Sequence, residues 1–204
     1  MSEIEELPKG WMKTTVKDVS LSIQYGYTES STIENIGPKF LRITDIQENK
    51  VCWQNVPYCK ISEAEIERYL LHDGDLVFAR TGATVGKSFL IKGVIPKAIF
   101  ASYLLRLRFP EQIFDKFISY YFQSPFYWNE ILKKQVGTGQ PNVNGTVLGI
   151  LQFPLPPSQN NTASSPKQKN SSAAWIKASR VLRPRRHNLK PIARRCSNGL
   201  LKGS

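Results

Sequence analysis

The chain has 204 residues, 41% of them hydrophobic, and a formal net charge of +12 at pH 7. This length suits one or two domains with a sizeable core, and no stretch approaches the roughly 18 apolar residues of a membrane span. The acidic residues 1–11 lack the apolar centre of a secretory signal, so we expect a cytoplasmic protein. Two distant histidines and cysteines without metal-ligand spacing exclude a zinc or histidine-based catalytic site, and no cofactor is expected.

The positive charge is concentrated at one end of the chain. Residues 1–157 hold 17 Lys and Arg against 16 Asp and Glu, whereas residues 158–204 hold 11 Lys and Arg and no acid. The segment after Pro157 is polar, has no apolar period and cannot bury enough surface to offset its ordering entropy. We therefore predict a folded domain over residues 1–157 and a disordered basic tail over residues 158–204. Because the folded part is nearly neutral, composition alone does not identify it as a DNA-binding domain.

The first two predicted elements are a strand and a helix. Lys39–Ile46 alternates in hydrophobicity as a half-buried strand does. Ser62–Leu71 is typical of a helix that begins at Ser62 as N-cap, with Glu65 completing a capping box.

Later segments complete a predicted α+β fold. Strands are expected at Asp75–Ala79, at Ser88–Ile91 as its hairpin partner, and at Ser102–Phe109, where Arg106 and Arg108 share one face. Helices are expected at Gln112–Gln123 and Pro125–Gln135. The order favours a twisted, mostly antiparallel β-sheet with packed helices.

A glycine-rich turn at Thr81–Ser88 (TGATVGKS) is close to a phosphate-binding loop. Such a loop needs Gly where Thr81 stands and a helix directly after Ser88. The sequence continues with the β-prone Phe89-Leu90-Ile91, so a hairpin turn with Gly82 and Gly86 at positive φ is the preferred interpretation. A nucleotide-binding enzyme that uses this turn is kept as the alternative function.

Two further groups of residues suit contact with nucleic acid. Residues 137–145 (GTGQPNVNG) form an irregular loop whose amide side chains can bond base edges, although a plain surface loop has the same composition. Basic and aromatic residues also recur on strands and turns, where a merely solvated face is the other interpretation; they are Tyr25, Tyr27, Lys39, Arg42, Arg80, Lys87, Arg106 and Arg108. No carboxylate pairs with a histidine or a second acid in a catalytic pattern, so we predict no enzyme activity.

The order of these motifs resembles a target-recognition domain of type I restriction-modification specificity subunits. The resemblance begins with LPKGW at residues 7–11 and runs through KFLRITDI (39–46), GDLVFARTGATVGKS (74–88), SYLLRLRF (102–109), VGTGQPNVNG (136–145) and FPLPP (153–157). In that family, two such domains alternate with two long helices that dock modification subunits, and each domain reads half of a split target without performing catalysis.

The resemblance implies that the GTGQPN loop and the ARTGATVGK hairpin lie near the DNA. It also implies double-stranded DNA and the modification (methyltransferase) and restriction subunits as partners. The candidate DNA-binding residues are Tyr27, Lys39, Arg42, Arg80, Thr81, Lys87, Thr138, Gln140, Asn142 and Asn144. A protein–protein adaptor with a disordered basic tail remains as a third interpretation.

The chain departs from the family's pattern after Pro157, where a spacer helix beginning PLPPLxEQxRIV is expected. Codons can be chosen for Gln159–Lys169 that encode TEQHRIVAETE when they are read one base earlier. Leu189–Gly203 can be back-translated to a helix-like sequence in the same frame. We therefore interpret residues 158–204 as an out-of-frame remnant of a spacer helix.

Overall fold

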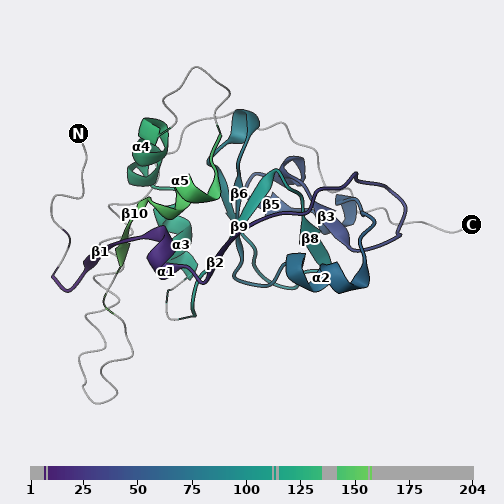
Figure 1. Ribbon diagram of the computed structural model, residues 1–204, viewed down its shortest axis with the longest axis horizontal. Helices are drawn as coiled ribbons and strands as arrows, with labels where there is room; N and C mark the ends of the chain where they lie inside the picture. Colours follow the sequence, from purple (N-terminus) through teal and green to yellow (C-terminus); the bar gives the residue numbers. More distant parts are fainter. Residues whose placement is uncertain are drawn as a thin grey trace, which may run out of the picture.

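The structure, a computed structural model, describes residues 7, 9–111, 113, 115–134, 142–155 and 157. Its centre is a four-stranded antiparallel sheet in the order β2 (Ser22–Tyr25), β9 (Leu104–Arg108), β6 (Leu76–Ala79) and β7 (Ser88–Leu90) (Figure 1). β6 and β7 form the predicted hairpin, with Val77 opposite Phe89. The predicted α+β class with a mostly antiparallel sheet is confirmed.

Both faces of the central sheet are covered. On β6, Leu76 and Phe78 belong to one apolar cluster, whereas Val77, which points the other way, belongs to a second cluster. All four residues of β6 are buried. A strand covered on both faces needs apolar residues at every position, which explains why its sequence, LVFA, has no polar alternation.

The larger cluster lies between the sheet and the helices of the C-terminal half. These helices are α3 (Asp115–Tyr121), α4 (Pro125–Lys134) and α5 (Gly145–Gly149), with the short α1 (Val16–Val19) beside them (Figure 1). Aromatic rings fill the space: Phe78 and Phe122 meet edge to face with 4.8 Å between centroids. α3 and α4 confirm the two helices predicted in this part of the chain, with α3 shorter than expected.

The first and last described strands also pair with each other. β1 (Met12–Thr15) lies antiparallel to β10 (Gln152–Leu155), with Met12 opposite Leu155 and Thr15 opposite Gln152. This two-stranded sheet borders the larger cluster, to which Phe153 contributes a fully buried ring.

The opposite face of the central sheet carries smaller elements. β3 (Lys39–Leu41) runs parallel to β8 (Ala98–Phe100), α2 (Glu63–Tyr69) packs on β8, and β4 (Ile46–Gln47) pairs with β5 (Lys50–Val51). The expectation of one strand over 39–46 is wrong beyond Leu41. The Asp45 carboxylate accepts a hydrogen bond from the backbone N–H of Arg42 at 2.8 Å, and residues Ile43–Asp45 form a 3₁₀ turn. A side chain that bonds the backbone locally thus replaces the strand.

Helix α2 begins where the sequence predicts and ends earlier. Ser62 is the N-cap residue, but its hydroxyl donates to the Glu65 carboxylate at 2.6 Å instead of capping the backbone. The capping box is therefore not formed. The helix ends at Tyr69 because the next residues join β8: the Leu71 N–H donates to the Ala98 carbonyl at 2.8 Å.

A close backbone approach follows β2. The Tyr27 N–H donates to the Phe100 carbonyl at 2.8 Å, and a Cβ at Gly26 would lie 2.2 Å from the Ala101 carbonyl oxygen. Only glycine fits there, so Gly26 lets the chain cross from β2 to the turn after β8.

Two predicted segments fall outside the described residues: the tail 158–204 and residues 137–141 of the loop, together with Gln135 at the end of the predicted helix. In the part of the chain that is described, no helix has the length and apolar character that crossing a membrane requires.

Candidate nucleic-acid interface

The turn between β6 and β7 is held by hydrogen bonds to the strand before it and to helix α4. Gly82 and Gly86 have φ of +79° and +82°, as predicted for the turn, and the Gly86 N–H donates to the Ala79 carbonyl at 2.8 Å. From α4, the buried Tyr127 hydroxyl donates to the Gly86 carbonyl at 2.6 Å. The turn is thus fastened to the helical layer, and Lys87 lies exposed on it.

The same geometry contradicts the nucleotide-binding alternative. A phosphate-binding loop needs a helix after it, so that backbone N–H groups converge on the phosphate. Here residues Gly82–Thr84 form a 3₁₀ turn and the chain continues into strand β7. The turn therefore lacks the helix N-terminus that the alternative function requires.

The C-terminal end of the predicted loop docks on this hairpin. Asn142 forms an antiparallel bridge with Thr81, and the N–H of the buried Val143 donates to the Arg80 carbonyl at 2.9 Å. Asn142 is exposed, whereas Asn144 is the N-cap of α5 and accepts a hydrogen bond from the Val147 N–H at 2.8 Å. The structure thus brings the hairpin and residues 142–145 of the loop together. Thr138 and Gln140 lie outside the described residues.

The Arg80 side chain has an aromatic neighbour and no acidic partner among the described residues. Its guanidinium carbon lies 4.8 Å from the centre of the Tyr25 ring, within the range of a cation–π contact. Among the described residues its side chain makes one hydrogen bond, from Nη1 to the Ser102 carbonyl, which is long at 3.4 Å. Arg80 and Lys87 therefore keep their positive charge available at the hairpin end.

The remaining predicted residues lie on the opposite side of the central sheet and are occupied by internal contacts. The Lys39 amine donates to the Val56 carbonyl at 2.7 Å and lies 3.9 Å from the centre of the Tyr58 ring. Arg42 forms an ion pair with Asp45 at 2.8 Å, and this hydrogen bond raises the pKa of Arg42.

Tyr27 is the exception that connects the two sides. Its ring packs on Tyr69 with 5.2 Å between centroids, while its carbonyl accepts from the N–H of Ser102, the residue that Arg80 also contacts. Of Tyr27, Lys39 and Arg42, Tyr27 is the one that contacts Ser102, the residue whose carbonyl accepts from the Arg80 side chain.

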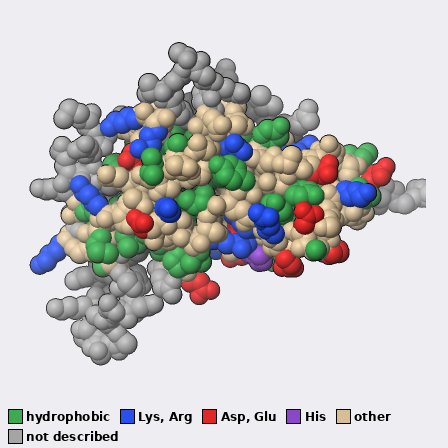
Figure 2. All heavy atoms as spheres, viewed as in Figure 1, with side chains coloured by type: hydrophobic (Ala, Val, Ile, Leu, Met, Phe, Trp, Pro, Cys, Tyr) green, Lys and Arg blue, Asp and Glu red, His purple; other side chains and the backbone are tan. Residues whose placement is uncertain are grey.

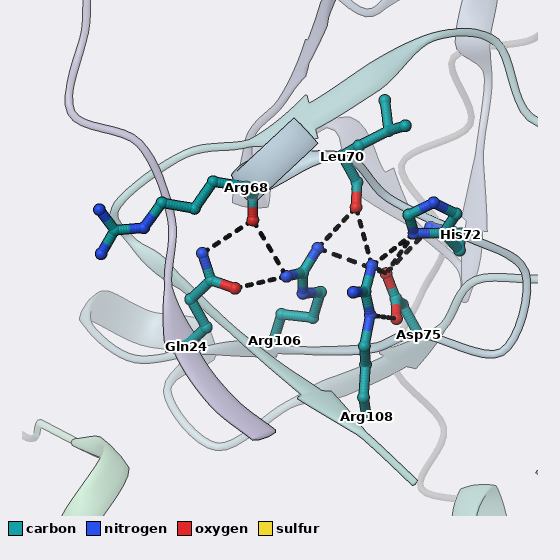
Figure 3. A network of polar contacts seen from close by, with 7 residues as sticks. All are labelled: Gln24, Arg68, Leu70, His72, Asp75, Arg106 and Arg108. Carbon is teal, nitrogen blue, oxygen red and sulfur yellow. Dashed lines mark hydrogen bonds and ion pairs between the residues drawn. The ribbon is translucent and has the colours of Figure 1, made fainter. Parts of the chain in front are cut away.

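Arg106 and Arg108 share one face of β9, as predicted, but they belong to an internal network (Figure 3). The Arg106 side chain is 2% exposed and donates to the carbonyls of Leu70 at 2.6 Å and Arg68 at 3.2 Å. The Asp75 carboxylate accepts from Arg108 Nε at 2.7 Å and lies 3.7 Å from Arg106 Nη1. Burial lowers the pKa of Arg106 to about 10, and the neighbouring Asp75 opposes that change.

This network excludes the two arginines from the candidate interface. It bonds the carbonyl groups at the C-terminal end of α2, where cations are favoured, and Gln24 from β2 joins it through Arg106 and the Arg68 carbonyl. These bonds link the C-terminal end of α2 to β2 and β9 of the central sheet. Over the face drawn in Figure 2, basic and acidic side chains are interspersed, in agreement with the near-neutral charge of residues 1–157.

Sequence reasoning missed Tyr103 because it placed this residue inside a strand. Residues 102 and 103 form a turn before β9, where the Tyr103 ring is 64% exposed and its carbonyl accepts from the Arg80 N–H at 3.1 Å. Exposed aromatic rings are common on surfaces that bind single-stranded nucleic acids, where bases stack on them. The one signal in the sequence is the polar Ser102, which interrupts the apolar run at the turn.

Comparison with known proteins gives a consistent family assignment. The family described as the type I restriction modification DNA specificity domain matches residues 8–172. The specificity subunit of the type I restriction enzyme MjaVIII from Methanocaldococcus jannaschii is 29% identical over 177 residues, covering 83% of this chain and 41% of that protein. The EcoKI specificity subunit from Escherichia coli is 24% identical over 150 residues, covering 71% of this chain and 32% of that protein.

Solved structures share the fold. The HsdS subunit from Thermoanaerobacter tengcongensis superposes with a TM-score of 0.59 at 17% identity, over 88% of this chain and 39% of that one. The S subunit of a type I restriction-modification system from M. genitalium gives a TM-score of 0.51 at 15% identity, over 87% of this chain and 41% of that one. The chain spans less than half the length of each of these relatives.

Proposed function

The chain belongs to the type I restriction modification DNA specificity domain family, and from this we propose that residues 1–157 form a target-recognition domain that reads one half of a bipartite DNA sequence. The observation that carries the proposal is the bridge between Thr81 and Asn142. It joins two segments of different character, one supplying the cations Arg80 and Lys87 and the other supplying amide side chains. Recognition of a duplex needs both, because phosphate contacts position a protein and base contacts specify the sequence.

The proposed division of labour follows from side-chain chemistry. Gln140 and Asn142 carry amides that can bond adenine through two hydrogen bonds, and Thr138 adds a hydroxyl. Arg80 bonds either a guanine edge or a phosphate, and Lys87, a compact point charge, contacts a phosphate. Asn144 supports the loop as the cap of α5 and contributes less to readout. Tyr27, Lys39 and Arg42 stay in the proposal as DNA contacts at the edge of the interface. They are placed there because their side chains already contact other parts of the protein, namely Tyr69, the Val56 carbonyl and Asp45.

The proposed function is binding without catalysis. Within the described residues, no group of three His, Cys, Asp or Glu side chains is close enough to hold a metal ion. The proposed partners are the modification and restriction subunits of a type I complex in the cytoplasm, reached through spacer helices. Since residues 158–204 carry no spacer-helix pattern, we expect no stoichiometric modification subunit to co-purify with the chain. Stable co-purification would contradict that part of the proposal.

For residues 158–204 we propose the out-of-frame origin given above, and the nucleotide sequence around codon 157 tests it. Insertion of one C directly after codon 157 should restore the reading frame that encodes PLPPL.

The tail's eleven basic residues should bind any duplex weakly through counterion release. Removing residues 158–204 should therefore lower the dependence of affinity on salt and leave base preference unchanged. Loss of base preference with an unchanged salt dependence would make the tail a specific element.

The central experiment is competition binding of the full chain against a library of randomised duplexes. Arg80→Ala should cost about 1–3 kcal/mol and relax one base position if Arg80 reads guanine. If it holds a phosphate, binding should weaken evenly and the salt slope should fall by about 1. Gln140→Ala should behave as loss of a base reader and Lys87→Ala as loss of a phosphate contact.

Lys97→Ala is the matched control, because this exposed lysine lies beside Glu63 at 3.3 Å and its charge is already balanced. It should leave affinity and preference unchanged. Unchanged binding in all three test variants would remove this face from the proposal. A nucleotide titration that showed saturable binding at the hairpin would revive the enzyme alternative.

A further inference from the structure

Tyr25, at the end of β2, contacts both halves of the candidate interface. Its ring lies 4.8 Å from the guanidinium carbon of Arg80, and its hydroxyl accepts a hydrogen bond from the Gly145 N–H at 3.1 Å. Tyr25 is 43% exposed and itself adjoins the surface that carries Arg80. One side chain thus contacts the arginine of the hairpin and the backbone at the end of the loop.

The Arg80 side chain has few other constraints among the described residues. Its Nε is buried without a hydrogen-bond partner, and Nη1 makes one long hydrogen bond, to the Ser102 carbonyl. An arginine stacked on an aromatic ring keeps its planar fork in a fixed orientation, and the fork is the feature that selects a guanine edge or a phosphate. The Tyr25 ring is therefore the main determinant of the direction in which the Arg80 fork points.

The Gly145 contact gives Tyr25 a second, separate effect. Gly145 begins α5 and directly follows the N-cap Asn144, so a bond to its N–H fixes the segment that leads back to Asn142. The Val143–Arg80 backbone bond fixes the same segment from the hairpin side. Together, these contacts hold Arg80 and the exposed amide of Asn142 at a fixed distance from each other.

We propose that Tyr25 is a positioning residue for DNA recognition, whose ring orients Arg80 and whose hydroxyl sets the register of residues 142–145. The inference rests on the proposed function, because it assigns Arg80 and Asn142 to the DNA. Tyr25 acts through its neighbours and makes no base contact of its own.

Two substitutions separate the two effects. Tyr25→Phe keeps the ring and removes the hydroxyl, so Arg80-dependent preference should persist while exchange of the Gly145 amide with solvent becomes at least severalfold faster. The Gly149 amide, at the far end of α5, should not change. Tyr25→Leu removes the ring and should reduce Arg80-dependent base preference, or its phosphate contact, by about 3–10-fold, the range of an exposed to partly buried cation–π contact.

The test uses the full chain and the randomised duplex library, with thermal unfolding to establish that each variant is folded. If Tyr25 acts through Arg80, Tyr25→Leu combined with Arg80→Ala should bind as Arg80→Ala does alone. Tyr120→Leu, which changes a tyrosine that is 36% exposed on α3, is the matched control and should bind as the wild type.

The outcomes separate failure of the role of Tyr25 from failure of the proposed function. If Arg80→Ala changes binding while Tyr25→Leu is folded and binds as the wild type, the role of Tyr25 is overturned and the proposed function stands. Additive losses in the double variant would also overturn it. If Arg80→Ala has no effect, the proposed function fails at this face and the role of Tyr25 fails with it. Should Tyr25→Leu not fold, unchanged exchange of the Gly145 amide in Tyr25→Phe overturns the anchoring role independently.

Discussion

The most demanding test of the fold is the removal of one buried charge, by Asp75→Asn. The Asp75 carboxylate accepts from Arg108 Nε at 2.7 Å and from the His72 backbone N–H at 2.9 Å, and it is the anion nearest to the buried Arg106. The substitution preserves shape and leaves two arginine cations without a counter-charge, one of them 2% exposed.

The expected cost follows from that geometry. Removing one partner of a buried ion pair typically costs about 3–5 kcal/mol, because the remaining charge stays desolvated. Arg106 keeps its bonds to the Leu70 and Arg68 carbonyls, and Arg108 is partly exposed, so we expect the lower end, about 3 kcal/mol. For a chain of this size each kcal/mol lowers the melting temperature by about 2–4 °C, which gives a fall of roughly 6–12 °C.

Urea unfolding followed by circular dichroism measures the change in the free energy of unfolding. Asp73→Asn is the matched control, two residues away on the same turn: its carboxylate lies 3.0 Å from Lys92 but is 55% exposed. An exposed pair contributes only about 0–1 kcal/mol. If the two substitutions cost the same, or if Asp75→Asn costs less than about 1 kcal/mol, the argument that this network holds α2 to the sheet is wrong.

Three further substitutions test other parts of the fold. Burial raises the pKa of Glu130 above its ordinary value of 4.5, so the folded state binds the proton more tightly than the unfolded chain does. As pH rises from about 4.5 through the raised pKa, the wild type should therefore lose stability relative to Glu130→Gln. If the urea midpoints of the two proteins changed in parallel with pH, this expectation would be wrong. Tyr127→Phe removes the hydroxyl that donates to the Gly86 carbonyl at 2.6 Å, and it should lower the free energy of unfolding by about 1–3 kcal/mol. An unchanged melting temperature would contradict the role of this bond in holding the turn. Gly26→Ala should destabilise by roughly 1–3 kcal/mol or more, since its Cβ would meet the Ala101 carbonyl, and a wild-type melting temperature would refute that clash.

The elements that the sequence predicted well are those fixed by local interactions. The β6–β7 hairpin follows from an apolar run, two glycines that take positive φ, and a second β-prone run within a few residues. The strand expected through Ile46 failed for an equally local reason that alternation does not record: Asp45 bonds the backbone of Arg42. The alternation of apolar and polar residues indicates which side chains would share a face, but it does not indicate whether the chain stays extended.

What covers each face could not be predicted from the pattern. Arg106 and Arg108 alternate with leucines just as residues of a solvated face do, yet the end of α2 lies over them and converts them into structural groups. Period and composition do not contain the information that pairs a strand with a helix some 36 residues earlier.

The candidate site shows the same limit. Its hairpin and loop were identified from their composition and from the resemblance, because glycines and amides mark both segments. The contact of Tyr25 with Arg80 and Gly145 joins three distant stretches of chain and depends on the sheet order, so no single segment predicts it. Tyr103 was missed for a related reason, since the turn before β9 is set by the hydrogen bonds of Ala101 with Leu41 and of Ser102 with Tyr27, both far away in the sequence.

The pairing of β1 with β10 has a consequence for how such a domain can be inherited. Met12 lies opposite Leu155, so the chain enters and leaves the fold at neighbouring points, with Gly10 beside Pro157. A unit whose ends lie close together can be inserted into a host chain without moving the flanking parts apart. Recombination at two points near these ends would transplant the whole surface of Arg80 and Asn142 in one event, while the flanking protein keeps its own geometry. The pairing thus favours the exchange of this surface between proteins as one intact unit.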